Sequence, residues 1–454
     1  QPAPAEQGWD FEPFEPFVED GRIFGRGASD DKSGVMIIAT ALRLAKLRHD
    51  VIVLEHEDRL GGRLHRRERG EFSWDRHGES FTLPAVLRDL FRKTGRPLER
   101  ELDLTHLTPG RRHVFSDLTP LDLPTGSRGA QTTAIDDALG DGGELWNSWL
   151  DTLAPVWEVL RQRVLERPFA GRSDLDRHQL RTLRPRRAVR TLARRTFKDH
   201  RLRAIVLDAV RAQGQPTRST PGFVAVTHHV ERLFGRWRVD GGMPALLATL
   251  ESRLDLRGVD VRLGVRALDV HGDAAGVRGV ETEDGALDAD AIVWAAPTPP
   301  PSLPPYRGLP LIPPAITHLG LGIDAPDLPN DTVLHENPVV TIHTGGSSPL
   351  GYRTWTVEHS GGGEDVLKTL ARRGLNVADF VVERIDVSPT DRLIESGPGF
   401  GWQWQGWRSA LDRPGVGAAS MPGLYFVGAS AHPGPSLELV GLGAAAVAES
   451  IGRA

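Results

Sequence analysis

The pattern of apolar and polar positions changes several times along the chain, and its first clear period begins just after residue 34. Apolar residues recur there at helical spacing, namely Val35, Ile38, Leu42 and Ala45. Residues 51–54 then form a short unbroken apolar run. The first pattern is typical of a helix with one buried face, and the second of a parallel strand covered on both faces. Together they predict the helix and the second strand of a βαβ unit.

The remaining pattern predicts a helical middle between two α/β parts. Residues 81–213 contain long stretches with helical period, such as LPAVLRDLFRKTG and LWNSWLDTLAPVWEVLRQRVLE. Residues 220–300 favour a turn, a helix, a strand, a hairpin and a buried strand in that order. A proline-rich segment, 297–305, favours a hinge, and alternating strands follow it. Near the end, GLYFVGAS predicts a buried strand that ends in Gly428, and a helix rich in small residues begins near Val440.

Composition narrows the class of protein. The 454 residues are 39% hydrophobic and 25% charged, which predicts a soluble globular chain of two or three packed units. No apolar run is long enough to span a bilayer, and the first residues lack a secretory pattern, so we expect a cytoplasmic protein. The absence of Cys excludes disulfides and thiolate chemistry. The net charge of −5 gives no reason to expect nucleic acid as a partner, and nothing indicates the oligomeric state.

The end of the strand predicted at residues 51–54 carries residues suited to an adenine dinucleotide. Glu55 lies 55 − 34 = 21 residues after Gly34, close to the usual spacing for a carboxylate that accepts hydrogen bonds from ribose hydroxyls. Gly61 and Gly62 then allow the backbone to approach a ligand closely, and Arg63 can meet a phosphate. An ordinary strand end followed by a surface turn is the alternative interpretation.

The C-terminal stretch PGLYFVGASAHPGPSLELVGLGAAA offers a second ligand-binding feature. The N–H groups at a helix N-terminus near Val440 favour electron-rich oxygens, and a flavin carbonyl is one such group. Gly441, Gly443 and Ala444 leave room for a large flat ligand. Plain packing of a helix on a strand is the alternative.

These pieces, in this order, resemble the phytoene desaturase-like branch of the FAD-dependent amine oxidase superfamily over about residues 41–454. The matching stretches are LRLAKLRHDVIVLEHEDRLGGRL, LPAVLRDLFRKTGRPLERELDL, GRWRVDGGMPALLATLESRL, ADAIVWAAP and PGLYFVGASAHPGPSLELVGLGAAAVAE. The resemblance implies an α/β fold with a discontinuous Rossmann-type FAD-binding domain and an inserted α+β substrate domain. It also implies an oxidoreductase that removes hydride from an apolar, isoprenoid-like substrate.

The same resemblance implies domain bounds and residue roles. The FAD-binding domain would comprise 25–80, 214–300 and 416–454, the substrate domain 81–213 and 301–415, and residues 1–24 would be a foreign, poorly packed segment. Glu55 would bind the ribose, and the backbone of Ala267 would meet adenine. Gly61 and Gly62 would line the cofactor channel, and Gly428 would lie by the pyrophosphate. The isoalloxazine would lie over Val440 and Gly441. The sequence identifies no catalytic acid or base, and we expect no metal site.

The chain departs from the family at the glycine-rich turn. The three fingerprint positions hold Lys32, Gly34 and Ile37, so only the middle glycine is present. Residues 27–31, where the first strand belongs, are polar and include two carboxylates, which suit neither a buried strand nor a neighbouring pyrophosphate. The alternative to an FAD enzyme is therefore a flavoenzyme scaffold that does not bind FAD.

The first 40 residues have a different resemblance. QPAPAEQGWDFEPFEPFVEDGRIFGRGASDDKSG is similar to the two-metal zinc aminopeptidase/dipeptidase family, in which Asp30 would bridge the metals. The family's upstream His and downstream Glu–Glu pair have no counterpart here, and one Asp cannot hold two zinc ions. A zinc peptidase is thus a minor alternative. We interpret the chain as a junction of two unrelated sequences, joined within the helix predicted at 34–47.

Weaker signals remain. The basic stretch 181–203 could lie on an anionic membrane surface, although a solvated helix explains it as well. His228, His229 and the WQWQGW stretch at 402–407 favour packing over ligand binding.

Overall fold

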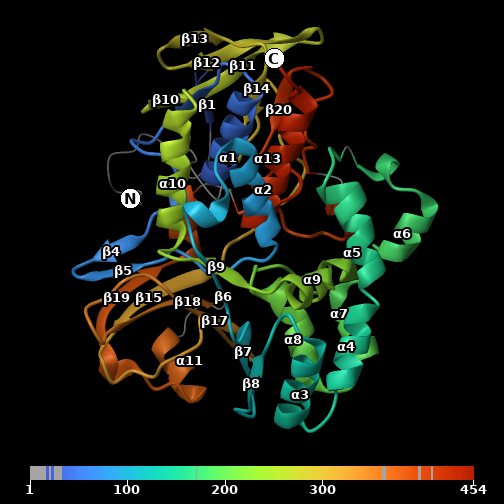
Figure 1. Cartoon of the computed structure of the whole chain (residues 1–454), viewed down its shortest axis with the longest axis vertical. Helices are drawn as coiled ribbons and strands as arrows, with labels where there is room; N and C mark the ends of the chain where they lie inside the picture. Colours follow the sequence, from blue (N-terminus) through green and yellow to red (C-terminus); the bar gives the residue numbers. More distant parts are fainter. Residues whose placement is uncertain are drawn as a thin grey trace.

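A computed structural model describes residues 17–19, 22–24, 33–169, 171–359, 365–396, 400–410 and 413–454, and of 17–19, 22–24, 33, 34, 396, 410 and 440 it describes the backbone alone. Its elements form three packed bodies (Figure 1). At one end lie helices α1, α2, α10 and α13 with short parallel strands and a three-stranded meander. At the other end a seven-stranded sheet lies beside a body of helices.

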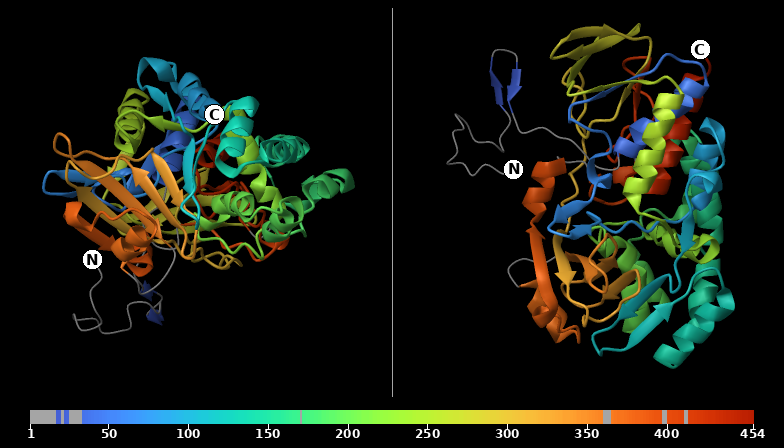
Figure 2. Two further views of the ribbon diagram at one scale, coloured as in Figure 1. Left: turned by 90° about the horizontal axis from the view of Figure 1, so that it is seen from below. Right: turned by 60° about the vertical axis from the view of Figure 1, so that its left-hand side comes forward.

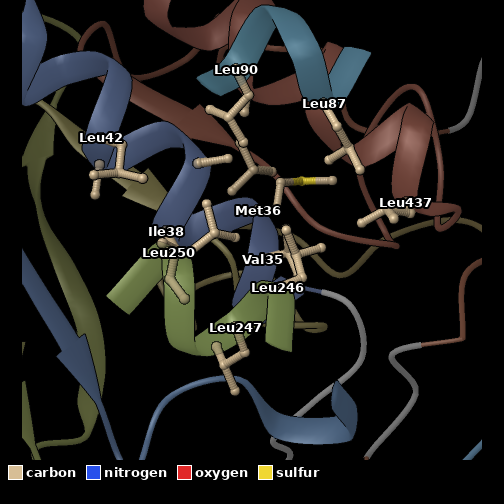
Figure 3. Close-up of a cluster of buried hydrophobic side chains, with 14 of the residues drawn as sticks. Val35, Met36, Ile38, Leu42, Leu87, Leu90, Leu246, Leu247, Leu250 and Leu437 are labelled. Carbon is tan, nitrogen blue, oxygen red and sulfur yellow. The ribbon is translucent and has the colours of Figure 1, made fainter. Parts of the chain in front are cut away.

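Four helices form the centre of the first body, and they share one apolar cluster. Its helices bury leucines and small residues against one another, so α1 is covered on several sides (Figure 3). Val35, Ile38 and Leu42 of α1 are fully buried, as the sequence pattern predicts, and Ala45 is partly buried against the same cluster. The helices are α1 Ser33–Lys46, α2 Pro84–Thr94, α10 Met243–Leu256 and α13 Leu437–Ile451.

Two separate pairs of parallel strands accompany these helices. Strand β3 (Ile52–Glu55) pairs with β10 (Asp260–Leu263), and β14 (Ile292–Trp294) pairs with β20 (Leu424–Phe426). In a doubly wound sheet of order 3-2-1-4, the strand preceding α1 lies between strands 2 and 4, which here are β3 and β14. Among the residues that the structure describes, none pairs with the second edge of β3 or of β14.

The expectation that β3 is covered on both faces is wrong, because Ile52 and Val53 point to opposite faces and only one of them is buried. Val53 is buried, but Ile52 is 45% exposed. The missing neighbour would be residues 27–31, which lie outside the described part of the chain.

A meander caps the first body, at the top of Figure 1. The hairpin expected after residue 275 is present as β12 (Gly276–Thr282) and β13 (Gly285–Asp288), and β12 also pairs with β11 (Ala267–Asp273). Its apolar side chains pack with those of β14 and β20 in one cluster.

The seven-stranded sheet combines two distant stretches of the chain, in the strand order β19-β15-β18-β17-β16-β7-β8. Only β16 and β7 run parallel to each other. Helix α11 (Val366–Arg372) packs on it through an apolar cluster that includes the buried Trp355. The strands are β7 Arg111–Val114, β8 Pro120–Leu123, β15 Ala315–Leu321, β16 Asp331–Leu334, β17 Val340–Thr344, β18 Arg353–His359 and β19 Val381–Val387.

The third body contains the helices predicted for the middle region except α2, which belongs to the first body, and it has its own aromatic-rich core. The long helical stretch near residue 150 is divided into two helices and a π-helical turn, Arg161–Leu165. The helices are α3 Arg128–Leu139, α4 Gly143–Asp151, α5 Ala154–Leu160, α6 Arg177–Leu183, α7 Val189–Thr196, α8 His200–Arg211 and α9 Val226–Phe234.

Smaller elements link these bodies. Strands β4 and β5 form an antiparallel pair, β6 pairs with β9, and α12 follows β19. Near the N-terminus β1 and β2 form a further antiparallel pair, which stands apart from the main body in both views of Figure 2. None of the helices in the described residues is both long and apolar enough to cross a membrane. These smaller elements are β1 Phe17–Glu19, β2 Arg22–Phe24, β4 Arg67–Arg69, β5 Phe72–Trp74, β6 Leu104–His106, β9 Trp237–Val239 and α12 Pro389–Ser396.

Candidate functional site

Glu55 is the last residue of β3, the position predicted for the ribose-binding carboxylate. Its carboxylate accepts a hydrogen bond from the N–H of Glu57 at 3.0 Å and lies 3.0 Å from Nδ1 of His56. Partial burial raises the pKa of Glu55, but these hydrogen bonds and the charge of His56 outweigh it, and the net pKa is lowered. Glu55 is therefore held ionised, in the state that accepts hydrogen bonds from hydroxyl groups.

The Gly-Gly-Arg segment forms a tight turn into a short 3-10 helix, Gly62–Leu64. Gly61 has φ 96° and Gly62 has φ 51°, in the left-handed region that favours glycine. A Cβ at Gly61 would lie 2.2 Å from Cδ2 of Leu247, on α10. In Figure 3 Leu247 points away from the cluster, toward the chain segment below it. The turn therefore touches α10 directly, and a leucine side chain fills the space beside Gly61.

Arg63 has the clearest sign of an absent partner. Its Nε and Nη1 atoms are buried without a hydrogen-bond partner in the described part of the chain. Its guanidinium lies over the ring of Phe400, 4.2 Å from the ring centroid. Arg392 also lies over this ring, at 4.9 Å. A buried guanidinium with free donors is costly unless an anion or carbonyl oxygen accepts from it, so Arg63 fits a residue that contacts a phosphate or a flavin carbonyl.

Ala267, the predicted adenine contact, is linked to Glu55 through the backbone. The N–H of Val265 donates to the carbonyl of Glu55 at 2.9 Å, and β11 begins two residues later at Ala267. The structure thus brings Glu55 and the start of β11 to the same end of the β3–β10 pair.

Gly428 follows β20 by two residues and is buried, with φ 108°. The Sδ atom of Met36 accepts from its N–H. Met36 belongs to the first turns of α1, next to the fingerprint positions, and is fully buried. In Figure 3 its sulfur points between Leu87 and Leu437. A thioether therefore lies against the N–H of Gly428, the residue that the resemblance places by the pyrophosphate.

The last helix begins earlier than the sequence predicts. Helix α13 starts at Leu437 after Ser436, three residues before Val440. Val440 and Gly441 therefore lie within its first turns. A Cβ at Gly441 would come 2.4 Å from Cγ1 of Val86, so this glycine allows close contact between α13 and α2. The alternative interpretation, helix packing, thus has a direct structural basis at Gly441.

Gly34, the one fingerprint glycine that is present, lies in the first turn of α1.

The residues present fit the two ends of a flavin dinucleotide better than its middle. An ionised Glu55 and the unpartnered Arg63 suit the adenosine ribose and a phosphate or flavin oxygen. Ser430 adds a buried hydroxyl without a hydrogen-bond partner in the described residues, two positions after Gly428. Met36, in contrast, fills the space next to the N–H of Gly428.

Sequence reasoning missed several of these neighbours. Phe400 and Leu247 come from segments far from the Gly-Gly-Arg turn, and no local pattern connects them to it. Met36 occupies a variable position of the fingerprint, so the sequence did not single it out. No cluster of three or more potential metal ligands occurs in the described residues, while Asp30 lies outside them.

The model of the family described as flavin containing amine oxidoreductase matches residues 38–322, more than half of the chain. The chain belongs to this family. A model of peptidase family M20/M25/M40 matches residues 1–54, so this short N-terminal stretch is similar to another family. The two matches overlap over residues 38–54, in and just after α1, which is where the sequence suggested a junction.

Several proteins similar to this member of the amine oxidoreductase family are desaturases. Phytoene desaturase of Neurospora crassa is 26% identical, over 91% of this chain and 82% of that protein. Hydroxyneurosporene desaturase of Cereibacter sphaeroides is 23% identical, over 92% of this chain and 96% of that protein. Phytoene dehydrogenase of Streptomyces griseus is 28% identical, and the match spans 66% of this chain and 61% of that protein.

Solved structures show the same fold. Putrescine oxidase bound to putrescine aligns with a TM-score of 0.63 at 16% identity, covering 92% of this chain and 96% of the other. Cyclohexylamine oxidase from Brevibacterium oxydans aligns with a TM-score of 0.61 at 17% identity, covering 92% and 97%. The mixed α/β fold is therefore that of flavin amine oxidases, and membership of the family points to a flavin-dependent oxidoreductase.

Proposed function

We propose that the chain is an FAD-dependent oxidoreductase that removes hydride from an apolar, isoprenoid-like substrate. The observation that carries the proposal is the buried guanidinium of Arg63, which lacks a hydrogen-bond partner among the described residues and follows the Gly-Gly turn after Glu55. The desaturase relatives support the choice of a carotenoid-like substrate.

The proposed roles follow the geometry. Glu55 would bind the ribose hydroxyls, the backbone at Ala267 would meet adenine, and Arg63 would donate to a phosphate or flavin oxygen. Gly61 and Gly62 would line the channel once Leu247 turns aside, and Gly428 would lie by the pyrophosphate once Met36 does. Val440 and Gly441 would lie near the flavin ring. When bound, the flavin supplies the hydride acceptor.

An aromatic group beside β20 offers a wall for an apolar substrate. The ring of Tyr306 lies 5.5 Å from that of Trp402 and 6.3 Å from that of Phe426. Burial raises the pKa of Tyr306, so its hydroxyl stays protonated. The group can therefore contact a hydrocarbon without placing a charge next to it.

The activity can be tested with FAD and phytoene in lipid vesicles. Each desaturation extends the conjugated double bonds, so we expect new absorption in the visible range that depends on added FAD. Arg63→Ala should abolish it, whereas Arg69→Ala, in the neighbouring exposed strand β4, should leave it unchanged. FAD binding without any conversion of phytoene would contradict the proposed substrate while leaving the cofactor assignment intact.

A second candidate, a flavoenzyme scaffold that does not bind FAD, is favoured by the contact between Met36 and Gly428. Ile37 also replaces the third glycine of the fingerprint, which allows close packing of the helix on the strand. Equilibrium dialysis with FAD distinguishes the candidates, because the scaffold would retain no FAD above the level of a denatured control.

A further inference from the structure

An open cavity of about 660 Å³ lies beside α6, α7 and the short helix η7, Trp407–Ala410. None of the candidate cofactor residues lines it. Figure 1 shows α6 at the outer edge of the helical body. The cavity is lined by six arginines, namely Arg172, Arg181, Arg184, Arg186, Arg187 and Arg195.

The positive charge of this cavity is not neutralised. Residues 177–198 contain nine Arg and Lys and no acidic residue, in a chain whose net charge is −5. Within the described part of the chain, none of the six lining arginines forms an ion pair with a carboxylate. Arg201, a few residues later, does pair with Asp199 at 2.8 Å. The cavity therefore concentrates guanidinium groups whose donors are free for an anion.

The backbone that carries these arginines is held in place. The N–H of Gly222 donates to the carbonyl of Arg187 at 2.6 Å, and the N–H of Val189 donates to that of Thr220 at 2.9 Å. Arg184 ends α6 with φ 45°, in the left-handed region that a non-glycine residue adopts at a cost. Strain of this kind is retained where the surroundings fix a position, so the arginines are presented by a pre-organised loop.

The cavity also has an apolar part. Trp407 lines one side, and the guanidinium of Arg172 lies over its ring at 5.4 Å from the centroid. Leu180, Pro185 and Ala188 line the cavity as well. A ligand that fills this space would combine an anionic group with an apolar chain.

We propose that this cavity binds a phosphate or diphosphate group that is carried on an apolar chain. Guanidinium groups form paired hydrogen bonds with phosphate oxygens, and the apolar wall accommodates the attached hydrocarbon. The group can come from a soluble organic phosphate or from a phospholipid headgroup. The site is independent of FAD, because it shares no residue with the candidate cofactor site.

The test is calorimetric titration of the full chain with inorganic pyrophosphate. Replacing two lining residues, Arg184→Gln with Arg187→Gln, should weaken binding by at least about tenfold, since each hydrogen bond to a charged group contributes strongly. The matched control, Arg177→Gln with Arg194→Gln, removes the same charge from α6 and α7 outside the cavity lining. It should change the affinity by less than about threefold, as expected for screened surface charges. Equal losses in both pairs, or no binding to the unmodified chain, would overturn the proposal.

Hydrogen exchange of the unmodified chain gives a second readout that needs no variant. Pyrophosphate should slow exchange in residues 180–195, and unchanged exchange there would overturn the site. Vesicles of phosphatidylcholine with phosphatidic acid identify the source. If pyrophosphate displaces the chain from these vesicles, the headgroup enters the cavity. If the vesicles do not bind while pyrophosphate does, the ligand is a soluble phosphate.

Discussion

Arg236 and Asp331 show how single residues join the sheet to the helical body. Arg236 is almost fully buried and pairs with both Glu231, on α9, and Asp331, on β16. Asp331 also lies 2.7 Å from Nδ1 of His343. Arg111 pairs with Glu231 as well, so these buried charges compensate one another in a network, and each is costly to leave alone.

Removal of one partner should therefore destabilise the protein strongly. We expect Asp331→Asn to lower the free energy of unfolding by about 3–5 kcal/mol, because it leaves Arg236 less compensated in a buried position. Urea denaturation measures this loss. The matched control is Asp327→Asn, whose side chain is 89% exposed and lies 3.6 Å from Arg353. It should change the free energy by less than about 0.5 kcal/mol, and an equal loss in both variants would contradict the role of the buried network.

The same network predicts a pH range of maximal stability. Burial raises the pKa of Glu231, but the charges of Arg111 and Arg236 outweigh it and hold the pKa at about 2, below its ordinary 4.5. Its contribution is complete above 4.5 and is lost as the pH falls toward 2. Burial lowers the pKa of His343, yet its hydrogen bond with Asp331 raises it above 6.5 overall. That contribution is complete below 6.5 and is lost as the pH rises through the raised pKa.

We therefore expect the urea concentration at the midpoint of unfolding to decrease when the pH is lowered under 4.5. It should also decrease, more gradually, when the pH is raised above 6.5. His343→Gln should remove the decline on the alkaline side while leaving the acid decline in place. An alkaline decline of the same size in His343→Gln would show that another group titrates there.

At the scale of elements, the local apolar pattern was enough to predict a helix or strand where one face of that element is buried. The period of α1 and the run at β3 predicted both elements to within one or two residues, because their apolar spacing reflects packing on the first body. The small-residue helix predicted near Val440 is present as α13, which starts three residues earlier, at Leu437.

The unpaired edges of β3 and β14 lead to a prediction about the segment before α1. Replacing residues 27–37 with an apolar strand and a Gly-x-Gly-x-x-Gly turn should fill this position and remove Met36 and Ile37 at the same time. We expect the repaired chain to retain far more FAD after gel filtration than the unmodified chain. A carboxylate about 4 Å from a phosphate costs about 4 kcal/mol at an effective dielectric constant near 20, so removal of Asp30 and Asp31 should contribute.

Glu55→Ala in the repaired chain is the companion variant. It should lower FAD retention again, because the ribose hydroxyls lose their acceptor. Glu57→Ala, at a more exposed neighbour, is the matched control. Equal retention in the repaired chain with and without Glu55 would mean that this carboxylate does not bind the ribose.

For the whole molecule, the fold class could be predicted and the seven-stranded sheet could not. Strands β7 and β8 lie in a region that the sequence predicted to be mainly helical. They were not predicted because their own apolar pattern is short and mixed. Strand β7 pairs with β16, more than 200 residues later, and β8 pairs with β7, and no local period encodes the long-range pairing. The cofactor roles of the candidate residues stay predictions, and Met36, Leu247 and Phe400 approach these residues only in the folded chain.

The most direct test is the FAD affinity of the unmodified chain and of the chain repaired at residues 27–37, measured by flavin fluorescence in one titration series. We expect weak FAD binding to the unmodified chain and much tighter binding to the repaired one, since the scaffold is that of a flavoenzyme and only the phosphate-binding turn is replaced. Failure of the repaired, folded chain to bind FAD would contradict the flavin site. Unmodified protein that purifies fully loaded with FAD would contradict the limiting role of the turn.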